Sequence, residues 1–169
     1  IEKEKLLKDL AFISSDKLKG RKIGKQGSLL AQEYIENSLE LSGVSRFNGK
    51  FKHSFALKSH EGNNIIGIVL GKIKNGKYIV LTAHYDHLGS RGNIVFNGAD
   101  DNASGVSALL SIAKEIAEKP LKSTVIFLFT DGEEINLLGS KAFISQNPDV
   151  IKKTALNINI DMISGESRT

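Results

Sequence analysis

Four short motifs rich in histidine and carboxylate residues follow one another along the chain. They are AHYDHLG at 83–89, NGADDNASG at 97–105, TDGEE at 130–134 and NINIDM at 157–162. Each motif comes at or just after a short apolar run, which places each at the end of an expected strand. Imidazole nitrogens and carboxylate oxygens bind zinc in proteins, and hydrolytic zinc sites keep one position for water. The motifs therefore predict a zinc hydrolase site at one edge of an α/β sheet.

Single residues in these motifs fit different parts of such a site. His84 is a first metal ligand, and Asp86 could orient it by accepting its other ring proton. Asp101 lies in a turn before an expected helix, where its carboxylate could reach between two cations while the helix N-terminus moderates its charge. A plain helix N-cap is the alternative for this stretch. Asp161 follows the sequence INI at the end of an expected buried strand, where a buried carboxylate would need a cation partner.

The remaining acidic and histidine residues leave more than one interpretation. Glu133 and Glu134 are adjacent, so one could bind metal while the other acts as general base, although a solvated acidic turn is the alternative. His87 could line the site, but a structural or surface histidine is the preferred interpretation. His53 and His60 lie in polar strand-edge surroundings and are not expected to bind metal.

The elements that must position these residues alternate between helices and strands. Apolar spacing predicts helices at 2–13, 28–41, 103–119 and 137–146, and strands at 46–55, 64–70, 78–84, 123–130 and 155–162. The sequence KNGK at 74–77 predicts a hairpin-type turn. Buried strands are expected to end in His84, Thr130 and Asp161. The alternation predicts a three-layer α/β fold, with a mostly parallel mixed central sheet and helices on both faces. Ligands bind beyond the carboxyl ends of strands in such sheets.

Composition narrows the class of protein further. The 169 residues, 40% of them hydrophobic, fit one domain spanning 1–169. The absence of cysteine excludes disulfides and cysteine-based zinc sites, and no run of about 18 apolar residues predicts a membrane span. The net charge of +4 comes from scattered lysines, which indicates a solvated surface rather than a nucleic-acid partner. Because the chain starts at Ile1 rather than Met, we expect a processed protein with a periplasmic or secreted location.

The motifs, above all GADDNASG, resemble those of metallopeptidase family 28, a family of co-catalytic zinc exopeptidases. The family includes bacterial leucyl aminopeptidases, with glutaminyl cyclases and receptor-type domains as divergent relatives. The resemblance runs from about Ile13 to Met162 and implies removal of N-terminal residues from peptides with a free N-terminus. It also implies two zinc ions per site. By resemblance, the zinc ligands are His84 and Asp161 for one ion, Glu134 for the other and Asp101 between them, with Glu133 as general base and Asp86 orienting His84.

The chain departs from the family pattern in one respect. The family places a last zinc-binding histidine well downstream of the Asp161 motif, whereas no histidine follows His87 and the chain stops at Thr169. We interpret the chain as a fragment or truncated product that lacks the C-terminal part of the fold. We therefore expect one strong zinc site, a weak second site and low peptidase activity. An uncompleted sheet would leave an unpaired edge, which favours a homodimer.

Three other functions fit parts of the pattern. A single-zinc enzyme of the glutaminyl-cyclase type would need only the one strong site. A non-catalytic receptor-type domain would be expected to have lost its metal ligands. A two-zinc carboxypeptidase of the deacylase type also uses His-x-Asp and Glu-Glu, and would act on substrates with a different free terminus.

Overall fold

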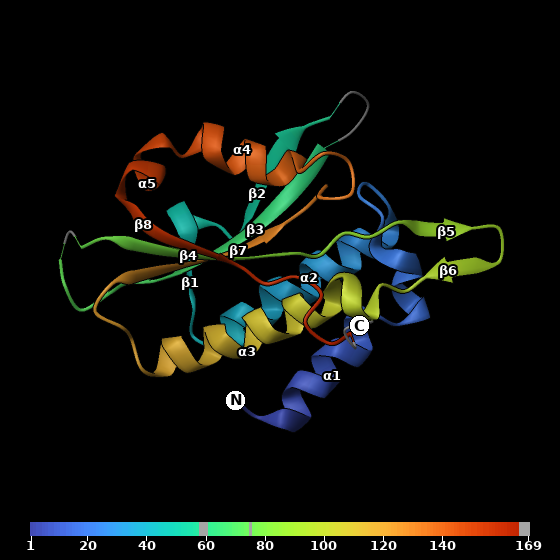
Figure 1. Ribbon diagram of the computed structural model, residues 1–169, viewed down its shortest axis with the longest axis horizontal. Coiled ribbons are helices and arrows are strands. Elements are labelled where there is room, and N and C mark those ends of the chain that lie inside the picture. The colour runs from blue at the N-terminus through green and yellow to red at the C-terminus, as the bar shows by residue number, and fades with distance from the viewer. Residues whose placement is uncertain (58–60, 75, 166–169) are drawn as a thin grey trace.

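A six-stranded sheet forms the centre of the computed structural model, which describes residues 1–57, 61–74 and 76–165. Neighbouring strands follow the order β1-β3-β7-β4-β8, and β2 also pairs with β3. The strands are β1 (Ser45–Arg46), β2 (Lys52–Ala56), β3 (Glu61–Val69), β4 (Tyr78–His84), β7 (Thr124–Thr130) and β8 (Thr154–Asn159). A separate ribbon consists of β5 (Gly89–Arg91) and β6 (Ile94–Phe96), and it projects from one end of the molecule (Figure 1).

Helices cover both faces of this sheet (Figure 1). They are α1 (Lys3–Ile13), α2 (Gln26–Leu41), α3 (Gly105–Glu118), α4 (Leu138–Gln146) and α5 (Pro148–Lys153). The first three lie on one face, and α4 and α5 lie on the other. This arrangement confirms the predicted three-layer α/β fold. Among the residues described, none of the helices is long and apolar enough to cross a membrane.

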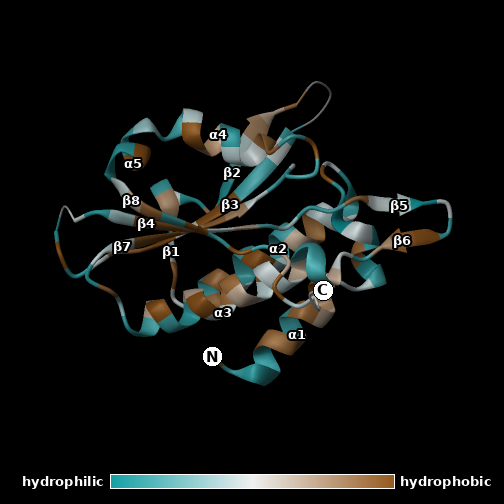
Figure 2. Ribbon diagram, viewed as in Figure 1, coloured by the Kyte–Doolittle hydropathy of each residue, from teal (hydrophilic) through white to brown (hydrophobic). Residues whose placement is uncertain are grey.

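Strand β7 provides the centre of the hydrophobic core. All seven of its residues are buried, because apolar helices pack on both of its faces. Phe127 and Phe129 belong to the larger core beneath α1, α2 and α3. Ile126 and Leu128 point the other way and pack with Phe143 of α4. Figure 2 shows hydrophobic residues concentrated in this central part of the sheet. The period of two along an apolar strand therefore fixes which side chains enter each core.

The register of the parallel strands brings their carboxyl ends to one edge of the sheet. Strand β4 runs parallel to both β7 and β8, with His84 opposite Thr130 and Thr82 opposite Asn159. Strand β3 runs antiparallel to β7, so the sheet is mixed, as predicted. Residues that follow β4, β7 and β8 consequently emerge close together.

Two local structures predicted in the first half of the chain, at 46–55 and 74–77, are wrong. The single strand expected at 46–55 is divided into β1 and β2 by a 3-10 turn at Phe47–Gly49, in which Asn48 has a φ of 48°. The hairpin expected at 74–77 does not form, because β7 lies between β3 and β4 in the sheet. Within that segment Asn75 lies outside the described residues, as does the histidine at position 60.

Strand β8 also differs from its prediction, since it is not buried. It lies at the edge of the sheet, and its residues from Ala155 to Asn159 are exposed. The apolar side chains of Leu156 and Ile158 are 49% and 45% exposed. Apolar residues in this segment therefore did not indicate a buried strand. An exposed apolar edge strand is a surface that can pair with another chain, and the homodimer stays a prediction.

A buried guanidinium, that of Arg21, joins three segments of backbone through four carbonyls. Its Nε donates to the carbonyl of Tyr85 at 2.8 Å, and its Nη1 donates to those of Ile13 at 2.7 Å and Asn97 at 2.6 Å. Its Nη2 donates to the carbonyl of Gly98 at 3.1 Å. Burial lowers the pKa of Arg21 to about 10, although nearby carboxylates oppose this effect. Arg21 thus holds the end of α1 and the loops after β4 and β6 together.

We predict that Arg21→Lys lowers the free energy of unfolding by about 3–5 kcal/mol, because each buried acceptor left without its donor costs about 1–3 kcal/mol. A lysine ammonium cannot reproduce the planar fork that reaches all four carbonyls. Urea unfolding followed by circular dichroism measures the change.

The matched control is Arg46→Lys. Arg46 pairs with Glu40 at 2.7 Å on the surface, where its side chain is 54% exposed. Exposed pairs contribute about 0–1 kcal/mol, so this substitution is expected to change stability by less than about 1 kcal/mol. Equal effects of the two substitutions would contradict the role assigned to Arg21.

Candidate metal centre

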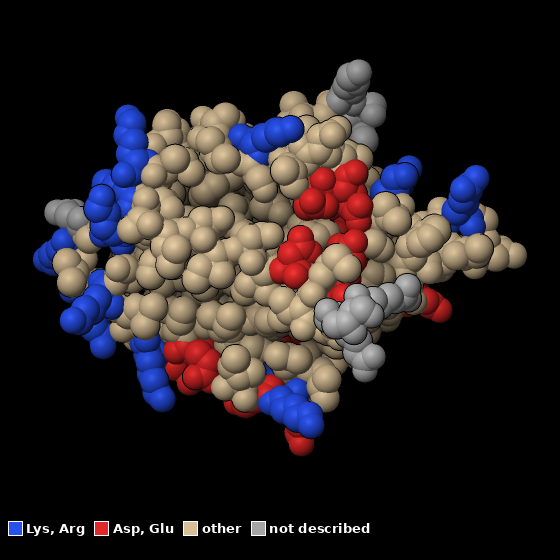
Figure 3. Space-filling view, in the orientation of Figure 1, with Lys and Arg blue, Asp and Glu red and all other residues tan. Residues whose placement is uncertain are grey.

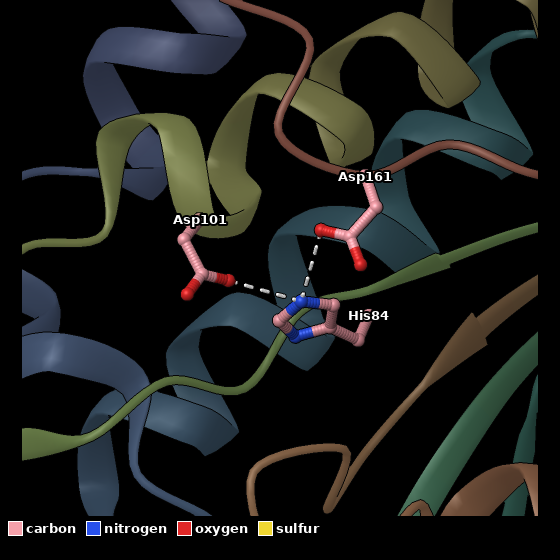
Figure 4. Close-up of side chains that lie close together, drawn as sticks. All are labelled: His84, Asp101 and Asp161. Carbon is pink, nitrogen blue, oxygen red and sulfur yellow. Dashed lines mark ion pairs between the residues drawn. The ribbon is translucent and has the colours of Figure 1, made fainter. Parts of the chain in front are cut away.

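The end of β4 carries the centre of the site. Nε2 of His84 lies 3.1 Å from Oδ1 of Asp101 and 3.5 Å from Oδ1 of Asp161 (Figure 4). Zinc with tetrahedral bonds of about 2.0–2.2 Å holds its ligand atoms roughly 3.3–3.5 Å apart. The three side chains therefore fit one zinc ion with very little movement, and together they form a candidate metal-binding group. The structure thus brings together three residues that the family resemblance implied as ligands of one ion, and their role as ligands stays a prediction.

The orientation of His84 is fixed by its other ring nitrogen. Nδ1 lies 3.1 Å from the backbone carbonyl oxygen of Asp86, whereas the nearest carboxylate oxygen of that residue lies 3.7 Å away. A proton on Nδ1 that is donated to the carbonyl leaves the Nε2 lone pair directed toward Asp101 and Asp161. Asp86, the residue expected to orient His84, is therefore in contact with it, but the shorter contact is made by its backbone and not by its carboxylate.

The carboxylate of Asp86 instead holds the turn that follows β7. It accepts hydrogen bonds from the backbone N–H groups of Glu133 at 3.0 Å and Glu134 at 3.3 Å. Asp86 is almost fully buried. It therefore fixes the position of both glutamates relative to the loop after β4, because a charged acceptor makes strong hydrogen bonds to backbone donors.

Asn102 is a site residue that sequence reasoning missed. Its buried side chain accepts from the N–H groups of Gly105 at 3.0 Å and Met162 at 3.2 Å, and it donates to the carbonyl of Ile160 at 2.9 Å. The amide thereby joins the segment of Asp101 to the segment of Asp161. Its place inside NGADDNASG was visible, but its partners 58 and 60 residues away were not.

Asp161 is more exposed than the sequence argument required. Its side chain is 39% exposed, so the expected cost of burying an unpaired carboxylate does not apply. Its position beside His84 is nevertheless as predicted. Asp161 also lies beyond the strand, since β8 ends at Asn159 and the N–H of Ile160 then bonds to the carbonyl of Thr82 at 2.8 Å.

A second group of ligand-type atoms lies beside the first. Nδ1 of His87 is 2.7 Å from Oε1 of Glu134 and 3.9 Å from Oδ2 of Asp101. These three residues also form a candidate metal-binding group. His87 is only 8% exposed, so it is not a surface histidine, and the interpretation as a structural histidine stays open. Sequence reasoning did not place it beside Glu134, although its position three residues after His84 offered a signal.

Glu133, the residue predicted to be the general base, lies close to the His84 group. Burial raises the pKa of Glu133 above its ordinary value, and the carboxylates of Glu134, Asp86 and Asp161 raise it further against the opposing effect of His84. Glu133, His84 and Asp161 all line a cavity of about 530 Å³ that extends between the sheet and α4. Acidic side chains gather on the surface beside the β5–β6 ribbon (Figure 3).

The charge of His84 gives the metal-free protein a defined pH dependence. Burial lowers the pKa of His84, but Asp86, Asp161 and Glu133 outweigh it and raise the value to about 9. A raised histidine pKa stabilises the fold fully below the unfolded value of about 6.5 and loses that effect as pH rises through the folded value.

We therefore predict that the chelator-treated protein loses roughly 3 kcal/mol of unfolding free energy between about pH 6.5 and pH 9–10. Denaturant unfolding across this range measures the loss, and His84→Gln should flatten it. Burial raises the pKa of Asp131 to about 7, so the comparison of the two proteins is made above about pH 8, where Asp131 is already ionised. If the unfolding free energy of His84→Gln depended on pH as steeply as that of the unmutated protein, His84 would not be the group responsible.

The chain is similar in sequence and in fold to several known proteins. Leucine aminopeptidase 1 of Trichophyton rubrum is 30% identical over 175 residues, which cover 96% of this chain and 45% of that protein. The LapA aminopeptidase of Legionella pneumophila shares the fold, with a TM-score of 0.78 at 19% identity over 96% of this chain and 43% of its own. A glutaminyl cyclase of Bacteroides thetaiotaomicron aligns with a TM-score of 0.75 at 23% identity over 98% and 63%.

The chain thus spans less than half the length of the leucine aminopeptidase that it matches. Residues 64–169 match the sequence model of peptidase family M28. This segment is more than half of the chain and contains all four motifs. The chain belongs to peptidase family M28.

Proposed function

We propose that this chain carries the metal-binding part of a zinc-dependent aminopeptidase that removes N-terminal residues from peptides. The observation that carries the proposal is the His84, Asp101 and Asp161 group, whose spacing fits zinc, next to a carboxylate suited to be a base. The names of its relatives and the family match support the same reaction class.

Each residue has a separate role in the proposed hydrolysis. His84, Asp101 and Asp161 would hold zinc, which when bound acts as a Lewis acid and lowers the pKa of water. Glu133 would accept a proton from the attacking water and deliver it to the leaving amine, a task that its raised pKa favours. Asp86 would keep Glu133 in place through the hydrogen bond to its backbone.

The acidic surroundings favour a substrate with a free N-terminus. An α-ammonium group is attracted to a concentration of carboxylates such as that formed by Asp101, Glu134 and Asp161. The cavity along α4 opens beside the same residues, and apolar side chains such as Leu128 and Phe143 form part of its wall. It could receive an apolar part of a peptide while the reacting bond lies near Glu133.

We predict that Glu133→Gln lowers kcat/KM for leucine p-nitroanilide about 10²–10⁴-fold and leaves zinc content unchanged. The amide cannot take the proton but fills the same space. His84→Ala is expected to lose both activity and zinc. His53→Ala is the control and should keep both, because the imidazole of His53 is hydrogen-bonded to the carbonyls of Phe47 and Lys50, outside the site. Elemental analysis and the rate of p-nitroaniline release test this. Full activity in Glu133→Gln would refute the assigned base.

A glutaminyl-cyclase-type reaction is the second candidate, favoured by the shared fold with the Bacteroides cyclase. The two reactions differ on a peptide that begins with glutamine. The aminopeptidase releases free glutamine, whereas the cyclase releases ammonia and leaves a cyclised peptide of the same length. We expect free glutamine, detected by mass spectrometry; a cyclised product would favour the cyclase.

The remaining predictions concern the location of the protein, its oligomeric state and two alternative functions. A periplasmic or secreted location and a homodimer are proposals that rest on the sequence and on the exposed edge of β8. A non-catalytic receptor-type domain is disfavoured because the ligand-type side chains lie together rather than being lost. Blocked and free substrate termini would separate an aminopeptidase from a deacylase-type carboxypeptidase.

A further inference from the structure

We propose that the β5–β6 ribbon is a docking surface for the part of a peptide substrate that follows its N-terminal residue. The surface fits peptides with acidic side chains about four to five residues from the N-terminus, a distance set by the length of the ribbon. This inference rests on the proposed function, because the ribbon lies in the chain between His87 and Asp101, two residues of the candidate site.

One face of the ribbon combines apolar and basic side chains. Opposite residues of an antiparallel pair share a face, and the two faces alternate along each strand. Two pairs of the ribbon therefore lie on the same face, Gly89 with Phe96 and Arg91 with Ile94. A Cβ at Gly89 would lie 2.9 Å from Cβ and 3.1 Å from Cδ of Lys22, so the stem of Lys22 covers this face as well.

The apolar side chains of this face remain exposed. Ile94 is 65% exposed and Phe96 is 38% exposed. Figure 2 shows β6 as hydrophobic, although the ribbon projects from the molecule. Exposed apolar side chains that lie together, with polar groups around them, mark a surface that binds another molecule.

The base of the ribbon is anchored, so this face keeps its position relative to the site. An isolated two-stranded ribbon is only marginally stable. The guanidinium of Arg21 donates to the carbonyl of Asn97 at 2.6 Å, and the amide of Asn97 donates to Asp16 at 2.8 Å. Gly20 approaches the ribbon so closely that a Cβ there would lie 2.5 Å from the carbonyl oxygen of Phe96.

The charges of the site and of the ribbon match two different parts of a peptide. The carboxylates of the two metal-binding groups attract the α-ammonium group. The segment 88–98 contains no Asp or Glu, and none of the ion pairs among the described residues involves Lys22 or Arg91. Figure 3 shows basic side chains on and beside the ribbon, next to the acidic side chains of the site. Lys22 and Arg91 are exposed and can attract carboxylates farther along the peptide.

The length of the ribbon determines which residues of the peptide it can contact. Arg91 lies four residues after His87, whose ring is 2.7 Å from Glu134. Four residues span at most about 13–14 Å. An extended peptide covers that distance in about four residues, so a peptide held by its α-ammonium group brings about its fourth or fifth side chain to Arg91. Lys22 lies closer to the site and can contact an earlier residue.

The test measures binding without cleavage. The zinc-loaded Glu133→Gln chain is titrated at low salt with two peptides labelled with fluorescein at the C-terminal lysine, Leu-Ala-Ala-Glu-Glu-Lys and Leu-Ala-Ala-Gln-Gln-Lys. The anisotropy of the label gives Kd for each. We expect the acidic peptide to bind about 3–10-fold more tightly, because exposed charge pairs are individually weak and two of them add. High salt should remove the difference.

Arg91→Glu, made in the same chain, is expected to abolish this preference. The matched control is Lys152→Glu, which changes the net charge equally at a side chain that is 78% exposed on α5, far from the ribbon (Figure 1). The control should keep the preference. A preference that persists in Arg91→Glu, or that is absent before any change to Arg91, would overturn the inference. Loss of the preference in both variants would indicate attraction by net charge alone and would also overturn it.

A second measurement does not depend on the folding of Arg91→Glu. Backbone ¹H–¹⁵N spectra of the Glu133→Gln chain are recorded during titration with the unlabelled acidic peptide. We expect the signals of Arg91 and Ile94 to shift. Shifts confined to the cavity beside α4 would overturn the inference. Conversion of a dimer to a monomer by Ile94→Ser would show that a second copy covers this face, and would overturn it as well.

Release of free leucine from the acidic peptide by the zinc-loaded, unmutated chain tests the proposed function separately. Leucine release combined with equal binding of the two peptides would overturn the inference and leave the proposed function intact. A charge preference that depends on Arg91, without any release of leucine, would support the docking surface and contradict only the proposed reaction.

Discussion

The parallel hydrogen-bond ladders that join β4 to β7 and β8 determine where the site can form. Because His84 lies opposite Thr130 and Thr82 lies opposite Asn159, the segments that follow the three strands leave the sheet at one edge. Carbonyls and N–H groups along these strands must be paired once the strands are buried, so the register cannot slip without a large cost. Asp86, Glu133 and Asp161 come together for this reason, although they are far apart in sequence.

The loops at this edge are then fixed by buried polar side chains that bond to backbone rather than to one another. Arg21 joins the loops after β4 and β6 through four carbonyls, Asp86 holds the N–H groups of both glutamates, and Asn102 links the segments of Asp101 and Asp161. Because these three side chains hold the loops, the carboxylates of Asp101 and Asp161 are not needed to fix the backbone. It also places one buried cation near a concentration of carboxylates that only further positive charge can balance.

Much of the fold was predictable from residue patterns, and the failures have physical causes. The strand at 78–84 and the helix ending at Ile13 were predicted correctly, because the spacing of apolar residues in each follows the side chains that the element buries. The divided strand at 46–55 depends on the left-handed backbone of Asn48, which propensity does not reveal. The hairpin at 74–77 failed because β7, which is distant in sequence, inserts between β3 and β4. Apolar residues in β8 were interpreted as buried, yet this strand lies at the edge of the sheet.

The sequence by itself determined the types and order of the chemical groups: a histidine after one strand, a glutamate pair after another and an aspartate after a third. These follow from local composition, whereas the grouping of His84, Asp101 and Asp161 came from the family resemblance of the motifs. Only the tertiary structure decided which atoms meet. It placed the carbonyl of Asp86 on His84, the carboxylate of Asp86 on the glutamate turn, and His87 against Glu134. Such contacts depend on strand register and loop closure to within about an ångström, and no pattern of residue types carries that information.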